Sequence, residues 1–136
     1  MEMLPLCQEE GVAYTPWSPL ARGMLAGIDY QGSDRAKGDG KAANLYSSKA
    51  DAAIIEEVIK IANERGVKAA QIATAWLLQV EGMTAPVIGP TEASQLKELI
   101  AATEITLSDE EVARLEAPYE LKPIMGVMEN HPGGRT

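Results

Sequence analysis

The stretch that decides the fold is PWSPLARGMLAG, residues 16–27. An apolar, β-prone run at residues 12–16 leads into it and breaks at a Ser-Pro pair, which is typical of a strand that ends in a loop. The loop offers an aromatic ring at Trp17, a hydroxyl at Ser18 and a guanidinium at Arg22. Such groups can stack on a planar ring and bind a phosphate. The alternative is a simple turn around a buried tryptophan.

A second informative segment is PVIGPTEASQL, residues 86–96. Residues 86–88 have the composition of a short buried strand, which a Gly-Pro pair ends. Thr91 is a suitable N-cap for a helix over residues 92–102. A strand, a glycine turn and a helix N-terminus form a natural anion site, because unpaired N–H groups and the helix dipole point outward. The alternative is an ordinary turn that binds nothing.

The remaining chain predicts three further helices and one long loop. Residues 50–65 place Ile54, Ile55, Val58, Ile61 and Ala62 at helical spacing, and Gly66 is a good stop. Residues 69–79 predict a second helix, in which Trp76 is expected to belong to the core. Ser108 with Glu111 forms a capping box that opens a third helix. The polar, glycine-rich residues 28–48 predict a loop.

Composition excludes several classes of function. The net charge of −8 argues against a nucleic-acid surface and against an anionic membrane surface. Apolar runs fall short of the roughly 20 residues that span a bilayer. The first residues lack the basic region of a signal peptide, and the single cysteine, Cys7, suits a reducing cytoplasm. The one histidine, His131, lies in a tail of turn composition, so we expect no catalytic role for it.

Four motifs in this order resemble the C-terminal part of the aldo-keto reductase family, in the group that includes bacterial and fungal reductases and potassium-channel β subunits. The resemblance extends from Met1 to about Gly126, which makes residues 1–126 the C-terminal part of a reductase domain and residues 127–136 a tail. The motifs are PWSPLARG at 16–23, Gly66 with AQIATAWLL at 70–78, PVIGPTEASQL at 86–96, and LSDEEVARL at 107–115 with Pro118-Tyr119.

This resemblance implies the α/β class and a (β/α)8 TIM barrel, a fold of about 250 residues. The chain would be an incomplete barrel that begins in the sixth helix (residues 2–10). It would supply strand seven (12–17) and strand eight (85–88), each with its helices, and a C-terminal helix. In the family, the catalytic Asp, Tyr, Lys and His lie on strands one to six. No residue here matches them, so we expect a fragment of an NAD(P)H-dependent reductase of aldehydes and ketones that is inactive alone.

The resemblance also carries over a set of cofactor residues. Trp17 matches the aromatic residue that stacks on the nicotinamide, and Ser18, Leu20 and Arg22 match the pyrophosphate site. Arg35 is the best candidate for the arginine that approaches the pyrophosphate from a lid loop; a solvated loop charge is the alternative. The positions that approach the 2′-phosphate and adenine of NADP are Gly89, Thr91, Gln95 and Glu98.

Two departures bear on the cofactor. Many relatives carry Lys or Arg after the threonine, where this chain has Glu92, and Asn four residues after the glutamine, where it has Leu99. A carboxylate beside a phosphate dianion is unfavourable, although a helix N-terminus partly offsets it. The chain is therefore expected to bind NADP weakly, to prefer NAD, or to have lost binding.

Two barrel strands cannot cover their own edges and inner face. Three hypotheses follow from this. The chain is an inactive piece of a reductase, a non-catalytic domain that buries the bare face in a homo-oligomer, or one subunit of a split reductase completed by a chain with the missing strands.

Overall fold

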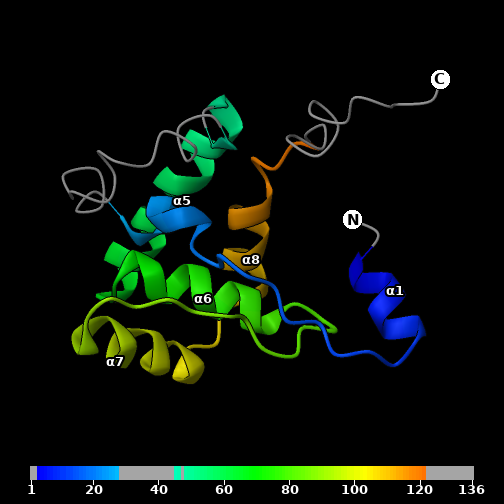
Figure 1. The fold of residues 1–136 in the computed structure, drawn as a ribbon. Coiled ribbons are helices and arrows are strands. Elements are labelled where there is room, and N and C mark those ends of the chain that lie inside the picture. The colour runs from blue at the N-terminus through cyan, green and yellow to red at the C-terminus, as the bar shows by residue number, and fades with distance from the viewer. Residues whose placement is uncertain (1–2, 28–44, 47, 122–136) are drawn as a thin grey trace, which may run out of the picture.

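The computed structural model describes residues 3–27, 45–46 and 48–121. Almost the whole predicted loop at 28–48, with Arg35, lies outside these residues, as do His131 and the tail at 127–136. Figure 1 shows the described elements along the chain. They are α1 (Met3–Glu9), the 3-10 helix η1 (Ala21–Ala26), α5 (Lys49–Arg65), α6 (Ala69–Gln79), α7 (Ala93–Ala101), the 3-10 helix η2 (Ala102–Glu104) and α8 (Asp109–Glu116).

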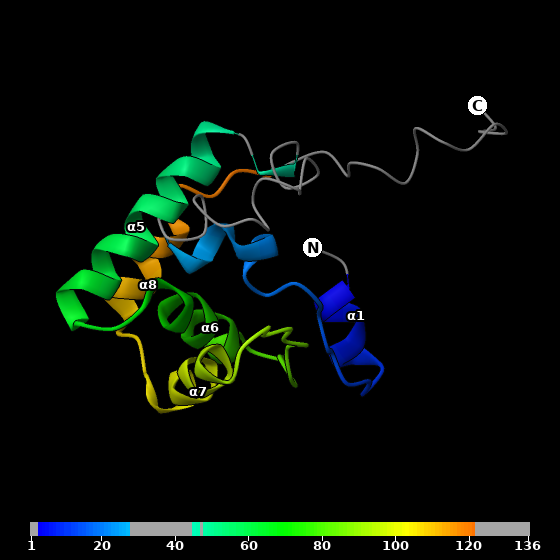
Figure 2. The same cartoon turned by 60° about the vertical axis from the view of Figure 1, so that its left-hand side comes forward.

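Helix α6 is the centre of the described structure, because it contacts α5, α7, η1 and η2. Figures 1 and 2 show α5 and α8 on one side of α6 and α7 on the other, with α1 apart from them. The sequence of α6, AAQIATAWLLQ, explains this position. It is apolar around much of its circumference, and a helix of that kind is expected to be buried.

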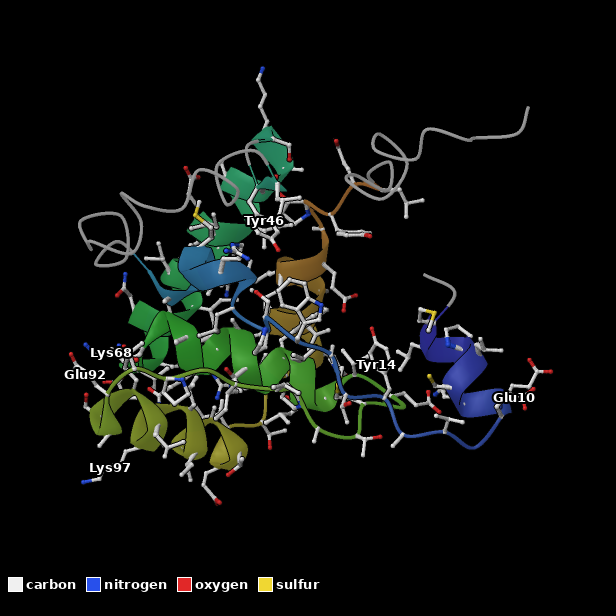
Figure 3. The ribbon with its side chains drawn as sticks, in the orientation of Figure 1. Glu10, Tyr14, Tyr46, Lys68, Glu92 and Lys97 are labelled. Carbon is white, nitrogen blue, oxygen red and sulfur yellow. The ribbon has the colours of Figure 1, made fainter. Side chains whose placement is uncertain are left out.

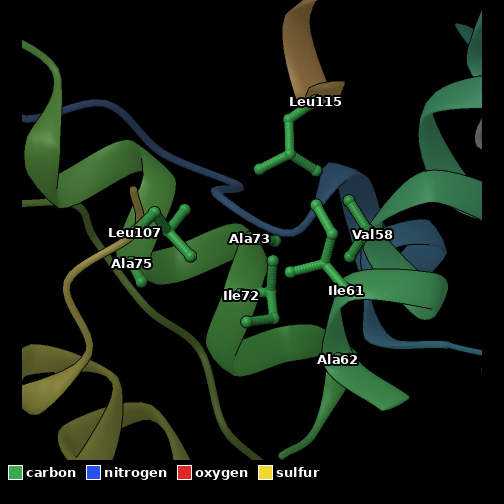
Figure 4. Packing of buried hydrophobic residues seen from close by; sticks show 8 residues of the cluster. All are labelled: Val58, Ile61, Ala62, Ile72, Ala73, Ala75, Leu107 and Leu115. Atoms are coloured by element: carbon green, nitrogen blue, oxygen red, sulfur yellow. The ribbon is translucent and has the colours of Figure 1, made fainter. Parts of the chain in front are cut away.

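The core lies where α5, α6 and α8 meet (Figure 4). Ile61 of α5 and Ile72 of α6 have no exposed surface, and Leu115 of α8 closes the cluster. The one buried polar side chain among the described residues, Thr74, donates its hydroxyl to the carbonyl of Ala70 at 2.7 Å. The full cluster is Val58, Ile61, Ala62, Ile72, Ala73, Ala75, Leu107 and Leu115.

Two predicted helix ends are confirmed. The backbone N–H of Ser108 donates to Glu111 at 2.7 Å, and the Ser108 hydroxyl accepts from the Glu111 N–H at 3.3 Å, which is the expected capping box. Gly66 ends α5 in the left-handed conformation, at φ 66°. Helix α5 begins at Lys49 rather than at the predicted Ala50, because a second capping box links Ser48 to Asp51.

The predicted cap of α7 is wrong. The helix begins at Ala93 with Glu92 at the cap position, and no side chain bonds there. Thr91 is instead held by Gln95, whose Oε1 accepts the Thr91 N–H at 2.9 Å and its hydroxyl at 3.2 Å. The helix also ends earlier than predicted, because residues 102–104 tighten into η2.

The two predicted strands, 12–17 and 85–88, form a parallel pair but not a regular ladder within the described part of the chain. Trp17 forms an isolated bridge with Val87, and Tyr14 forms another with Met83, which precedes the predicted second strand. Prolines 16 and 86 have no N–H to donate, and the Tyr14 N–H goes to the Thr84 hydroxyl at 3.0 Å. Too few consecutive backbone pairs remain for a strand.

Two arginines join α5 to α8. Arg65 donates Nε to Glu111 Oε1 at 2.6 Å, and Arg114 donates Nη1 and Nη2 to Glu64 at 2.9 and 3.0 Å. Arg114 Nε also bonds Glu57 at 2.5 Å. These contacts hold α8 against α5. None of the described helices is both long and apolar enough to cross a bilayer.

Candidate functional site

A groove of about 880 Å³ lies between the loop that follows residues 12–17, the start of α6 and the start of α7. Each predicted cofactor residue that the structure describes lines this groove. Arg35 lies outside the described residues. The predicted residues that the groove brings together are Trp17, Ser18, Leu20, Arg22, Gly89, Thr91, Gln95 and Glu98.

The first loop holds its side chains on an unusual backbone. Ser18, Ala21 and Arg22 have φ values of 58°, 48° and 59°, which are uncommon outside glycine. The Ser18 hydroxyl accepts the Arg22 N–H at 3.1 Å and so ties the loop together. Residues held in such conformations cluster at active sites and ligand clamps. The Trp17 side chain is 74% exposed, so its ring face is accessible.

The second loop, residues 89–92, lines the groove and leads into α7. Thr91 donates two hydrogen bonds to the side-chain oxygen of Gln95, and they hold this turn closed. Ser94 donates its hydroxyl to the Glu92 carboxylate at 3.3 Å, and Glu92 itself leaves the helix N–H groups uncapped. Leu99, which stands where many relatives carry Asn, is 7% exposed and forms an apolar part of the wall.

The sequence did not predict Lys68 as part of the groove. It lies at the cap position of α6, with an extended backbone at φ −83° and ψ 147°, and its side chain is exposed. Its backbone N–H donates to Gln71 Oε1 at 2.9 Å. The sequence contains one indication of a role for Lys68. Ser, Thr, Asn or Asp normally caps a helix by accepting a backbone N–H, and the lysine ammonium cannot accept a hydrogen bond, so Lys68 does not serve as a cap.

The comparison with known families places almost the whole chain in one of them. Residues 1–120 match the family model of the aldo/keto reductases. The chain belongs to the aldo/keto reductase family. The resemblance predicted from the four motifs is thereby confirmed.

Known members are similar over most of this chain. A Schizosaccharomyces pombe protein, provisionally named an aryl-alcohol dehydrogenase, is 39% identical over 127 residues, 92% of this chain and 36% of its own length. The versiconal hemiacetal acetate reductase of Aspergillus parasiticus is 34% identical over 98% of the chain and 38% of its own length. An aldo-keto reductase of Alternaria alternata is 36% identical over 92% of this chain and 34% of its own length. The chain thus spans little more than a third of the length of these relatives.

Aldo-keto reductases are (β/α)8 barrels that generally use NAD(P)H. Helices predominate among the described residues, and the two expected barrel strands are present there as extended segments. Two parallel extended segments lie side by side, and α5 and α6 connect them. The groove opens at the end of both segments, which corresponds to the face where barrel enzymes carry out their chemistry.

The residues of the groove fit a nicotinamide dinucleotide. Its volume is within the range of small-molecule and cofactor sites. The exposed ring of Trp17 provides a stacking surface, and Arg22 brings to the lining a guanidinium, the group whose planar geometry matches phosphate oxygens. Lys68 and the N-terminus of α7 add positive potential, which the Glu92 and Glu98 carboxylates oppose.

A second groove, of about 430 Å³, is almost entirely apolar and lies beside the core. Leu25, Trp76 and Tyr119 contribute to its lining. The Trp76 ring packs against the core, as predicted, and its indole N–H donates to Glu116 Oε1 at 3.0 Å. The structure therefore assigns Trp76 to packing rather than to the first groove.

Proposed function

We propose that this chain is the C-terminal part of an aldo-keto reductase barrel that binds a nicotinamide dinucleotide and, with the remaining strands, reduces aldehydes or ketones. The observation that carries the proposal is that eight residues from two distant segments line one groove. Residues 17–22 and 89–98 are far apart in the sequence, so local folding alone would not bring them together. The single cysteine suits the cytoplasm as the place of action.

Each residue has a role that follows from its chemistry. Trp17 stacks on the nicotinamide and keeps that ring flat. Arg22 binds pyrophosphate oxygens, and its φ of 59° is held by the hydroxyl of Ser18. Thr91 and Gln95 lie at the adenosine end, where the dinucleotide must replace or share their mutual hydrogen bonds. When bound, the reduced dinucleotide supplies the hydride that reduces a carbonyl carbon.

The 136 residues should not reduce carbonyls alone. Hydride delivery to a carbonyl needs a proton donor at the oxygen, and general acids contribute about 10²–10⁴-fold to such steps. The family places that donor and its partners on strands one to six, and no residue of this chain matches them. An NADPH-consumption assay with a reactive aldehyde should give the rate of the no-enzyme control. Turnover above that control, in protein free of host reductases, contradicts this part of the proposal.

A second observation supports the proposal that other strands cover one face of the extended pair. Trp17 of the first segment and Val87 of the second, which are bridged to each other, are 74% and 56% exposed. Tyr14 and Pro16, which alternate with exposed neighbours, are partly buried against the rest of the chain. Exposed and partly buried residues alternate in this way along a barrel strand when the strands that pack against its inner face are absent. A second copy of this chain, or a chain with the remaining strands, would cover the face.

Binding of the dinucleotide can be tested directly. Isothermal titration of the chain with NADPH and NADH should show weak saturable binding, and Trp17→Ala should reduce the affinity. Tyr119→Ala is a matched control, because Tyr119 is an exposed aromatic residue (51%) outside the first groove. If neither nucleotide binds, or if both variants lose affinity equally, the groove is not the cofactor site.

A further inference from the structure

The first groove contains a cation that the family motifs do not explain. Its ionisable lining side chains are Arg22, Lys68, Glu92 and Glu98. Lys68 comes from a different element from the other three, the start of α6, and its ammonium pairs with none of the described carboxylates. Figure 3 shows Lys68 and Glu92 close together at one end of the molecule, where α6 and α7 begin.

The local structure leaves the Lys68 side chain available to the groove. Its backbone N–H is already satisfied by Gln71, and its side chain cannot act as a helix cap. A cation at the N-terminus of a helix is opposed by the helix dipole, so α6 gains no stability from it. Its position beside Glu92, at the beginning of α7, puts it at the adenosine end of the site proposed above.

We propose that Lys68 supplies the positive charge for the 2′-phosphate of NADP, the charge that many relatives place after the threonine and that Glu92 reverses in this chain. This inference rests on the proposed function, because it concerns the same groove. It makes Lys68 a residue that determines specificity for a phosphorylated adenosine ribose over an unphosphorylated one. The ammonium also offsets the repulsion between Glu92 and the phosphate.

The test compares Lys68→Met with Lys97→Met in titrations with NADP and NAD at low salt. Lys97 is the matched control, since it is an exposed lysine on α7 that lies outside the groove (Figure 3). Lys68→Met should weaken NADP binding about two- to fivefold, the range of an exposed charge pair, and leave NAD binding unchanged. The difference should shrink at high salt, and Lys68→Arg should restore NADP binding.

The outcomes separate this inference from the proposed function. If the unmodified chain binds neither nucleotide, the proposed function fails and this inference fails with it. If the unmodified chain binds NADP and Lys68→Met keeps the same ratio of NADP to NAD affinity, the proposed function stands and the role of Lys68 is wrong. An equal loss for both nucleotides assigns Lys68 to a shared group such as the pyrophosphate, which also overturns the inference. Circular dichroism of each variant establishes that the fold is retained.

Discussion

At the scale of single residues, the groove combines features of a binding site with one that opposes binding. Ser18, Ala21 and Arg22 adopt left-handed backbone conformations, each of which costs about 1–3 kcal/mol and must be held by surrounding contacts. Ser18 supplies one such contact through its hydroxyl. Glu92, in contrast, sets a carboxylate at the wall where a phosphate is expected. The nucleotide preference is therefore sensitive to this one side chain.

Glu92→Lys should strengthen binding of NADP several-fold and shift the preference away from NAD. The substitution removes a repulsion and adds an attraction, each about 1 kcal/mol or less after screening at an exposed site. Titration of both forms with NADP and NAD at low salt measures the shift. Glu81→Lys makes the same charge change on an exposed residue outside the groove and should have little effect. An unchanged preference in Glu92→Lys means that the 2′-phosphate site does not lie at this helix.

At the scale of elements, α8 is attached through paired charges. Glu111 contributes twice, because it accepts the Ser108 N–H in the capping box and binds the Arg65 guanidinium of α5. Hydrogen bonds from Arg65, assisted by Ser108, lower the pKa of Glu111 from 4.5 to about 2. Hydrogen bonds from Arg114 likewise lower the pKa of Glu64. The helix–helix contact is thus coupled to the ionisation of these carboxylates.

The stability of the α5–α8 contact should fall in acid. A carboxylate with a lowered pKa in the folded state stabilises it fully above its unfolded value, near 4.5 for Glu111, and loses that contribution as the pH falls toward 2. Urea unfolding at a series of pH values should show Glu111→Gln less stable than the unmodified chain at pH 6. The free energies of unfolding of the two proteins should converge between about pH 4.5 and 2.

Glu110→Gln is the control for that experiment. Glu110 lies in the same first turn of α8, is exposed, and forms no ion pair with a described residue. Its substitution should leave the pH dependence close to that of the unmodified chain. If Glu111→Gln and the unmodified chain differ by the same free energy at every pH, the bond to Arg65 is not coupled to ionisation.

At the scale of the whole molecule, the helices form a core while the extended pair leaves a face open. The core buries residues of α5, α6 and α8 together. Trp17 and Val87, which are bridged to each other, remain largely exposed on the extended segments. Contiguous exposed apolar surface marks a site of association. We therefore expect copies of the chain to associate through this face in solution.

Light scattering should report a dimer or larger assembly of the 136-residue chain. Val87→Glu should shift the equilibrium toward monomer, because it places a charge on the apolar face. Ile100→Glu is a matched control, since Ile100 is similarly exposed (57% against 56% for Val87) but lies on α7. A folded monomer at about micromolar concentration, or equal effects of both substitutions, contradicts association through the extended pair.

Local signals in the sequence determined much of the fold and most of the candidate site. The capping box at Ser108, the left-handed stop at Gly66 and the helical periodicity of α5 depend on residues within a few positions of one another, so the sequence alone predicts them. Most of the predicted groove residues lie in two short motifs that the family shares, and Glu98 follows the second of them on the same helix.

The tertiary structure decided what depends on residues far apart in the chain. It brought Lys68 to the groove and joined α5 to α8 through Arg65 and Arg114. It reduced the two expected strands to isolated bridges, since their prolines lack donors and Thr84 takes the Tyr14 N–H. Periodicity and capping describe one segment at a time. These contacts form between segments, and only packing determines which donors and charges meet.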